Sequence, residues 1–310
     1  MFSPNEGQRL YSEAVRLETG DGCEPDITAA AKVYTESADL GFIPAINRLA
    51  DLYMSGRGVE RDHQKGRELF RKSSEMGDIE ATFNLGIIYR EGIGVAPDPD
   101  LALRMFAFAA EKGSVESMVE IASMHMYGEG VDQDIHAAFK WYAMAAERGD
   151  AMSQFKVGYL QEEGAGTEKD LRKAFGWYLK SAQQGLAEGQ FKTASFYYNG
   201  MGVKKDLNEA FSWYTLAVEQ GFVPALYNLA TMYYLGEGTD VDMVKAFALY
   251  SAAAESGDPD AQFRVGKMFF QGEGTEQDMV QGMEWFRKAA ANGNKYALEV
   301  IDKVENRRKP

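Results

Sequence analysis

The sequence predicts an all-α fold: a solenoid of about eight helix–turn–helix repeats of 36 residues, followed by a terminal capping helix. Three observations lead to this prediction. Gly-x-Gly pairs recur at constant spacing, an aspartate recurs at the same spacing, and the segments between them carry apolar residues at helical intervals. A fixed period of roughly 20–50 residues is typical of proteins built from stacked repeats.

The Gly-x-Gly pairs mark the repeats, and no insertion interrupts them. Their first glycines are Gly20, Gly56, Gly92, Gly128, Gly164, Gly200, Gly236 and Gly272. A third glycine row runs at the same period from Gly41 to Gly293, and an aspartate row runs from Asp26 to Asp278. Unbroken rows of this length do not arise by chance.

Between the aspartate and the third glycine, each repeat predicts one helix, which we call helix B. In residues 134–148, Asp134 stands where an N-cap carboxylate accepts a free backbone N–H. Pro99 directly follows Asp98, at the first helical position, where a missing N–H costs nothing. The third-row glycine supplies the left-handed residue that ends helix B.

The remaining segment of each repeat predicts a second helix, which we call helix A. In residues 225–235, Ala225, Leu229 and Met232 fall on one stripe, and the following Gly-x-Gly ends the helix. Helix A then occurs nine times, from about Glu6 to about Glu305, and helix B eight times. Because one helix pair cannot bury its apolar face alone, we expect stacking into one solenoid domain over residues 1–310. Residues 305–310 are predicted to form a frayed basic tail.

The composition narrows the function classes. The chain has 47 acidic and 33 basic residues, a formal charge of −14, which disfavours nonspecific binding to nucleic acid and to anionic membranes. No stretch approaches the roughly 18 unbroken apolar residues of a membrane helix, so no membrane insertion is expected. The start, MFSPNEGQRLYSEA, has no pattern of a secretory signal, so we expect a soluble, cytoplasmic chain.

Candidate chemistry is sparse. The one cysteine, Cys23, excludes an intrachain disulfide and a multi-cysteine zinc site. His63, His125 and His136 have no second histidine or cysteine at metal-ligand spacing, so surface or packing roles are predicted. The Gly-x-Gly pairs follow helices and not strands, so they are turns and not phosphate loops. We therefore predict no catalytic, cofactor or metal site, and no enzyme.

The pattern A-x-x-x-L-[GA]-x-x-Y-x-x-G-x-G-V-x-x-D-x-x-K-A-x-x-W-Y-x-x-A-A-x-x-G, clearest in residues 152–185 and 225–257, resembles the Sel-one-like repeat (SLR) family. These repeats are relatives of the tetratricopeptide repeats. The resemblance implies a right-handed superhelix with helix A on the concave side and helix B on the convex side. It also implies a non-catalytic scaffold or adaptor that holds partner proteins. A cysteine-rich branch of the family is linked to β-lactam binding, but this chain lacks its cysteine pairs.

One position departs from the pattern. The helix A residue that is Tyr53, Tyr89, Tyr197 and Tyr233 elsewhere becomes His125 and Gln161 in two adjacent repeats. Two interpretations remain open here. One is drift at a partly exposed site, and the other is a specialised groove or a local weak point in the middle of the array.

If helix A is concave, a helical projection places two rows of its residues in the groove. The first row reads Arg48, Asn84, Glu120, Lys156, Lys192, Asn228 and Arg264, and the second Asp51, Ile87, Ser123, Tyr159, Ser195, Thr231 and Lys267. From Lys156 onward the two rows contain four cations and no acid. Glu163, Glu188 and Asp260 lie near them and could neutralise them, so simply solvated lysines are the other interpretation.

Our hypothesis is that the C-terminal half of the groove binds a partner protein or peptide that carries acidic residues. The predicted partner-binding residues are Lys156, Tyr159, Lys192, Ser195, Asn228, Thr231, Leu235, Arg264 and Lys267. One alternative is a self-assembling structural solenoid. A small-molecule binder or enzyme of the β-lactam-binding type is a further alternative, which the single cysteine disfavours.

Overall fold

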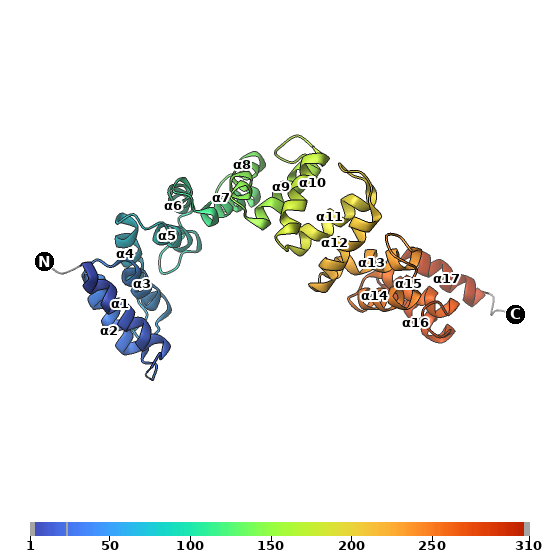
Figure 1. Cartoon of the computed structure of the whole chain (residues 1–310), viewed down its shortest axis with the longest axis horizontal. Helices are drawn as coiled ribbons and strands as arrows, with labels where there is room; N and C mark the ends of the chain where they lie inside the picture. The colour runs from blue at the N-terminus through green and yellow to red at the C-terminus, as the bar shows by residue number, and fades with distance from the viewer. Residues whose placement is uncertain (1–3, 23, 307–310) are drawn as a thin grey trace. The chain divides into compact units, whose positions relative to one another are not determined.

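The computed structural model describes residues 4–22 and 24–306, and every regular element within them is helical. Odd-numbered helices are the predicted helices A and even-numbered helices are helices B. Each helix contacts the next one along the chain within a repeat, as α1 and α2 do in Figure 1. The chain divides into two compact units, residues 1–148 and residues 149–310, which we call unit 1 and unit 2.

Unit 1 contains four helix pairs. They are α1 (Pro4–Thr19), α2 (Ile27–Asp39), α3 (Ile43–Ser55), α4 (His63–Glu75), α5 (Ile79–Glu91), α6 (Pro99–Glu111), α7 (Val115–Tyr127) and α8 (Ile135–Glu147).

Unit 2 contains four helix pairs and a last helix A. They are α9 (Ala151–Glu163), α10 (Leu171–Gln183), α11 (Ala187–Asn199), α12 (Leu207–Glu219), α13 (Leu226–Leu235), α14 (Met243–Glu255), α15 (Pro259–Gln271), α16 (Met279–Ala291) and α17 (Lys295–Asn306). A 3₁₀ turn, η1 (Val223–Ala225), precedes α13.

The aspartate row caps every helix B, as predicted. In all eight repeats the aspartate carboxylate accepts a backbone N–H from the first turn of the helix that follows. Asp134, for example, accepts the N–H of Ala137 at 2.9 Å. These bonds satisfy donors that would otherwise lack a partner at a helix start. They fix where each helix B begins.

The Gly-x-Gly pairs end helix A and bring the next loop against the preceding repeat. Gly236 caps α13 with φ of 71°, and Gly238 follows with φ of 72°. A Cβ at Gly238 would lie 2.2 Å from the carbonyl oxygen of Leu207, at the start of α12. Glycine is required here for both the left-handed backbone and the close approach.

Rows of small and aromatic residues on helix B lie in the core. Ala138, Ala174, Ala210 and Ala246 on helix B are fully buried, which permits close helix packing. One turn later, helix B contributes a buried ring, such as Tyr178, which packs over the small residue Gly158 of helix A. A Cβ at Gly158 would meet that ring at 2.9 Å. The same close contact recurs between Gly86 and Phe106 and between Gly266 and Phe286, so the helices of these pairs pack tightly.

The fold prediction is confirmed: the chain is an all-α solenoid of eight 36-residue helix pairs and a terminal helix, α17. A single domain over residues 1–310 stays a prediction. In the predicted tail, residues 305 and 306 belong to α17 and residues 307–310 lie outside the described residues, as does Cys23. None of the described helices combines the length and apolar character that crossing a membrane requires.

Candidate functional site

The nine predicted partner-binding residues lie on four helices A of unit 2. Lys156 and Tyr159 are on α9, Lys192 and Ser195 on α11, Asn228, Thr231 and Leu235 on α13, and Arg264 and Lys267 on α15. We call this set the helix A face of unit 2. Tyr159 is 45% exposed and Leu235 53% exposed, and the other seven side chains are partly buried. The set is thus reachable from solvent but not freely solvated.

Lys192 is already neutralised within the chain. Its Nζ lies 2.9 Å from Oε2 of Glu162 on α9, and the hydroxyl of Tyr178 donates to the same carboxylate. The Lys192 and Glu162 side chains are only 26% and 16% exposed. Burial is the main cause that raises the pKa of Tyr178, and the hydrogen bond to Glu162 is the second. The Tyr178 hydroxyl therefore stays protonated and remains a donor. Lys192 therefore fastens α11 to α9.

Glu163, Glu188 and Asp260 were the acids expected near these cations, but Lys192 pairs with Glu162 instead. The spacing of the charges could have indicated this pair. Ion pairs between residues 30 apart in sequence occur at three places along the chain. In unit 1, Arg48 pairs with Glu18, which also accepts the Tyr34 hydroxyl. Arg90 pairs with Glu120 in the opposite sense. In these three places, opposite charges 30 residues apart join adjacent helices A.

We call the penultimate residue of the helices α1, α3, α5, α7, α9, α11 and α13 the clasp position. These are residues 18, 54, 90, 126, 162, 198 and 234. Tyr198 and Tyr234 donate to Glu237 and Glu273, which lie inside the next Gly-x-Gly, at 2.6 and 2.8 Å. The bond to Glu237, with burial, raises the pKa of Tyr198 to about 12. The clasp is ionic in some repeats and a hydrogen bond in others.

At residue 54 the clasp is apolar. Met54 and Ile93, which lies inside the next Gly-x-Gly, pack against the core cluster that contains Phe70, Leu85 and Ile88. The position thus tolerates acidic, basic, phenolic and apolar side chains. In each of these cases the neighbouring repeat supplies a contact of matching chemistry.

Two of the predicted hydroxyl side chains are also engaged. The Thr231 hydroxyl lies 2.7 Å from the hydroxyl of Tyr250, and Ser195 hydrogen-bonds Tyr214. Burial raises the pKa of both tyrosines to about 12, so their hydroxyls stay protonated. These contacts join helix A to helix B of the same repeat. Ser195 and Thr231 therefore have a structural role, whether or not a partner also meets them.

Three predicted cations have no acidic partner among the described residues. Lys156 and Lys267 form no ion pair there, and Arg264 has its Nε 3.5 Å from the hydroxyl of Tyr227. Asn228 lies between them in the first groove row. These cations, with exposed Tyr159 and Leu235, are the part of the predicted site that internal contacts leave available.

The structure shows the surroundings of His125 and Gln161, the two residues that depart from the repeat pattern. Gln161 is only 7% exposed, so the interpretation of a partly exposed site is wrong on this point. Among the described residues, its Oε1 is buried without a hydrogen-bond partner, and so is Nδ1 of His125, which is partly buried. A buried acceptor without a partner lowers stability, because it gives up its bonds to water.

The other candidates for chemistry stay apart. His63 begins α4, His125 lies on α7 and His136 lies in the first turn of α8. In the part of the chain that the structure describes, no three His, Cys, Asp or Glu side chains converge as metal ligands.

This architecture defines an α-solenoid of helix-pair repeats. The chain belongs to the Sel1 repeat family, whose profile matches it eight times in succession, over residues 5–42, 43–78, 79–114, 115–150, 151–186, 187–222, 223–258 and 259–294. Proteins of this family are generally protein-interaction scaffolds and are typically non-catalytic.

Solved structures similar to this chain include the following two. One is c5321, a protective antigen of uropathogenic Escherichia coli strains with an SLR fold, at 29% identity and a TM-score of 0.92. The match covers 98% of this chain and 66% of c5321, so this chain spans just under two thirds of that protein. The other, a Sel1 repeat protein from Oxalobacter formigenes, has 24% identity and a TM-score of 0.72, and the match covers 97% and 87% of the two chains. A comparison with curated proteins gives no match.

Proposed function

We propose that this chain is a non-catalytic interaction scaffold that binds an acidic segment of a partner protein on the helix A face of unit 2. One observation carries the proposal: Lys156, Arg264 and Lys267 lie on that face without an acidic partner among the described residues. The family supports it at the coarser level, because Sel1 repeat proteins generally bind proteins.

The chemistry of the face suits an acidic peptide. Partly buried lysine and arginine side chains cover apolar surface with their stems and keep the charged heads accessible. A partner carboxylate would gain charge-assisted hydrogen bonds from these heads. The chain's net charge of −14 repels such a partner at long range. Within a Debye length of ~8–10 Å, however, the attraction between a partner carboxylate and these cations is only weakly screened.

The remaining residues of the face have different roles in the proposal. Tyr159 and Leu235 offer apolar contact area, and Asn228 offers an amide that can bond to a peptide backbone. Lys192 belongs to the stacking contact with Glu162, so its replacement is expected to lower stability before it affects a partner. A binding test should therefore leave Lys192 intact.

The test is a selection of random displayed peptides on the purified protein. Peptides retained by the native chain should be enriched in Asp and Glu. Reversing two unpaired cations, Lys156→Glu with Lys267→Glu, should abolish that enrichment. The matched control reverses two exposed loop lysines away from the face, Lys169→Glu with Lys204→Glu, and should keep it. Circular dichroism checks that all three proteins are equally helical.

Two outcomes would contradict the proposal. Acidic enrichment that survives in the Lys156/Lys267 variant would place the binding surface elsewhere on the chain. Absence of any enrichment, together with a sedimentation coefficient that rises with concentration, would favour the self-assembling solenoid.

A further inference from the structure

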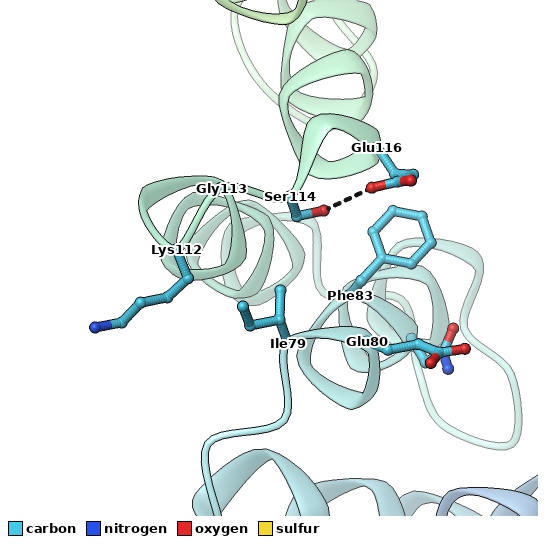
Figure 2. Close-up of a pocket in the computed structure, with 8 residues that line it drawn as sticks. Ile79, Glu80, Phe83, Lys112, Gly113, Ser114 and Glu116 are labelled. Carbon is cyan, nitrogen blue, oxygen red and sulfur yellow. Dashed lines mark hydrogen bonds between the residues drawn. The ribbon is translucent and has the colours of Figure 1, made fainter. Parts of the chain in front are cut away.

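A pocket of about 530 Å³ opens on unit 1, where the first turn of α5 meets the turn between α6 and α7. Its walls include Phe83 and Glu80 of α5 and Glu116 of α7. In Figure 2 the ring of Phe83 lies between the side chains of Glu80 and Glu116. An aromatic face between two carboxylates is the central feature of this pocket.

The lining is held in place by the core and by a helix cap. The Phe83 ring is partly buried and packs against Phe106, with ring centroids 5.6 Å apart. The Ser114 hydroxyl donates to Oε2 of Glu116 at 3.2 Å and accepts the backbone N–H of Ser117 at 3.1 Å. The N-cap of α7 therefore also orients one of the two carboxylates.

The charges of the two carboxylates are not compensated locally. Neither Glu80 nor Glu116 forms an ion pair within the described residues of unit 1. The one cation at the pocket rim, Lys112, points away from it in Figure 2, and its Nζ lies 5.7 Å from the ring centroid of Phe108. The pocket therefore presents two negative charges and a ring to an incoming group.

This combination occurs at one place in the repeat pattern. The equivalent positions along the chain are Pro44, Glu80, Glu116, Met152, Glu188, Pro224, Asp260 and Tyr296. Glu80 and Glu116 are the one pair of acids in adjacent repeats. Elsewhere an aromatic residue such as Phe191 has a single acid, Glu188, beside it, and the next repeat supplies Pro224. A general repeat feature does not explain the pocket.

We propose that this pocket binds an arginine side chain of a partner protein. A planar guanidinium can stack on the Phe83 ring while its N–H groups donate to both carboxylates. The volume is sufficient for one long side chain and the backbone around it. The inference rests on the proposed scaffold function, to which it adds a second subsite with the opposite charge preference.

The experiment titrates the full chain, labelled with nitrogen-15, with acetyl-Gly-Arg-Gly-amide and follows backbone amide signals. Gly113 and Ser114 line the pocket and report binding there. We expect saturable shifts of both signals with the arginine peptide. The citrulline peptide, which is neutral and nearly isosteric, should produce none at the same ionic strength. Glu80→Gln and Glu116→Gln should each weaken binding about two- to fivefold, and the double variant about tenfold.

Two further variants separate the pocket from general charge effects. Phe83→Leu keeps an apolar side chain but removes the ring, and should weaken binding roughly threefold. Glu188→Gln removes the equivalent acid on α11 and should leave the titration unchanged. Equal shifts with the citrulline peptide, or full binding by the double variant with native circular dichroism, would overturn the inference. Because the peptide selection tests other residues, in unit 2, either proposal can fail while the other stands.

Discussion

Arg90 on α5 forms an ion pair with Glu120 on α7, 30 residues further along the chain. Glu18 and Arg48 occupy the equivalent positions with the signs of the charges exchanged. The ring beneath the clasp position changes accordingly. It is Tyr34 beside Glu18, where the hydroxyl donates to the carboxylate, and Phe106 beside Arg90, where the guanidinium carbon lies 5.9 Å from the ring centroid. The geometry of the repeat places these two positions in contact. The residues at the two positions determine which helix carries the positive charge.

Reversing the pair in unit 2 should therefore be tolerated, although each single reversal is not. Glu162→Arg and Lys192→Glu should each lower the free energy of unfolding by about 1–3 kcal/mol, because a partly buried charge then faces a like charge. The double variant restores opposite charges in the order of Arg90 and Glu120, but it leaves the Tyr178 hydroxyl without its Glu162 acceptor. It should recover about half of the summed loss. Urea denaturation measures all four proteins of the cycle.

The control for that cycle is an exposed pair. Arg71 and Glu75 are 67% and 71% exposed, and Arg71→Glu should change stability by less than about 0.5 kcal/mol. If the double variant loses as much free energy of unfolding as the two single variants combined, the contact between residues 162 and 192 is not electrostatic.

The pKa of Glu18 predicts a specific dependence of stability on pH. The hydrogen bond from Arg48 lowers this pKa below its ordinary value of 4.5. The folded state then binds fewer protons than the unfolded state below pH 4.5, so stability falls as the solution becomes more acidic. The contribution is complete above pH 4.5 and is lost as pH falls through the lowered pKa of the folded state.

Glu18→Gln should remove this dependence. The difference in melting temperature between the native chain and the variant should be largest near pH 6–7 and shrink below about pH 4.5. A difference that stays constant from pH 7 to pH 3 would show that the carboxylate charge of Glu18 does not stabilise the fold.

The two kinds of glycine should respond differently to substitution. At Gly238, alanine adds a clash with the Leu207 carbonyl to the strain of a left-handed backbone, and should cost about 3 kcal/mol or more. At Gly221, φ is 79° and no atom lies within 4 Å of the added Cβ, so alanine should cost about 1–2 kcal/mol. Thermal unfolding of the two variants compares the cost of backbone strain alone with the cost of strain plus the clash. Equal losses would mean that the loop moves to relieve the clash.

Gln161 should be a site of easy stabilisation. Gln161→Met keeps the length of the side chain and removes the buried Oε1, which has no hydrogen-bond partner in the part of the chain that the structure describes. We expect the free energy of unfolding to rise by about 1 kcal/mol. A loss of stability would instead indicate that the amide makes a needed contact in solution.

Most of the fold could be predicted from the sequence, because its determinants are local. An aspartate cap, a left-handed glycine and an apolar stripe each act within a few residues, and the 36-residue period repeats the same signal eight times. The close approach of Gly238 to Leu207 is different, because it depends on how two repeats stack. The second glycine of each Gly-x-Gly marks this close approach between repeats. From the sequence, however, only the turn conformation of these glycines could be predicted.

The contacts of the predicted partner-binding residues were less predictable. Helical projection placed Lys192 in a predicted groove row, but a projection of one helix cannot show which side chains a neighbouring helix places beside it. Glu162 reaches Lys192 across the boundary between repeats. The pocket at Phe83 also forms from adjacent repeats, so neither feature is visible within one 36-residue unit.

The varied chemistry at the clasp position has a consequence for how the chain finds its native alignment. Repeats of equal length and similar sequence can pair out of step, or with a second chain, at little cost in buried area. A slip of one repeat would set Glu18 against Asn84 instead of Arg48, and Glu162 against Asn228 instead of Lys192. Each slip leaves a charge uncompensated. The different residues at the clasp position therefore favour the native pairing of the repeats over pairings shifted by one repeat.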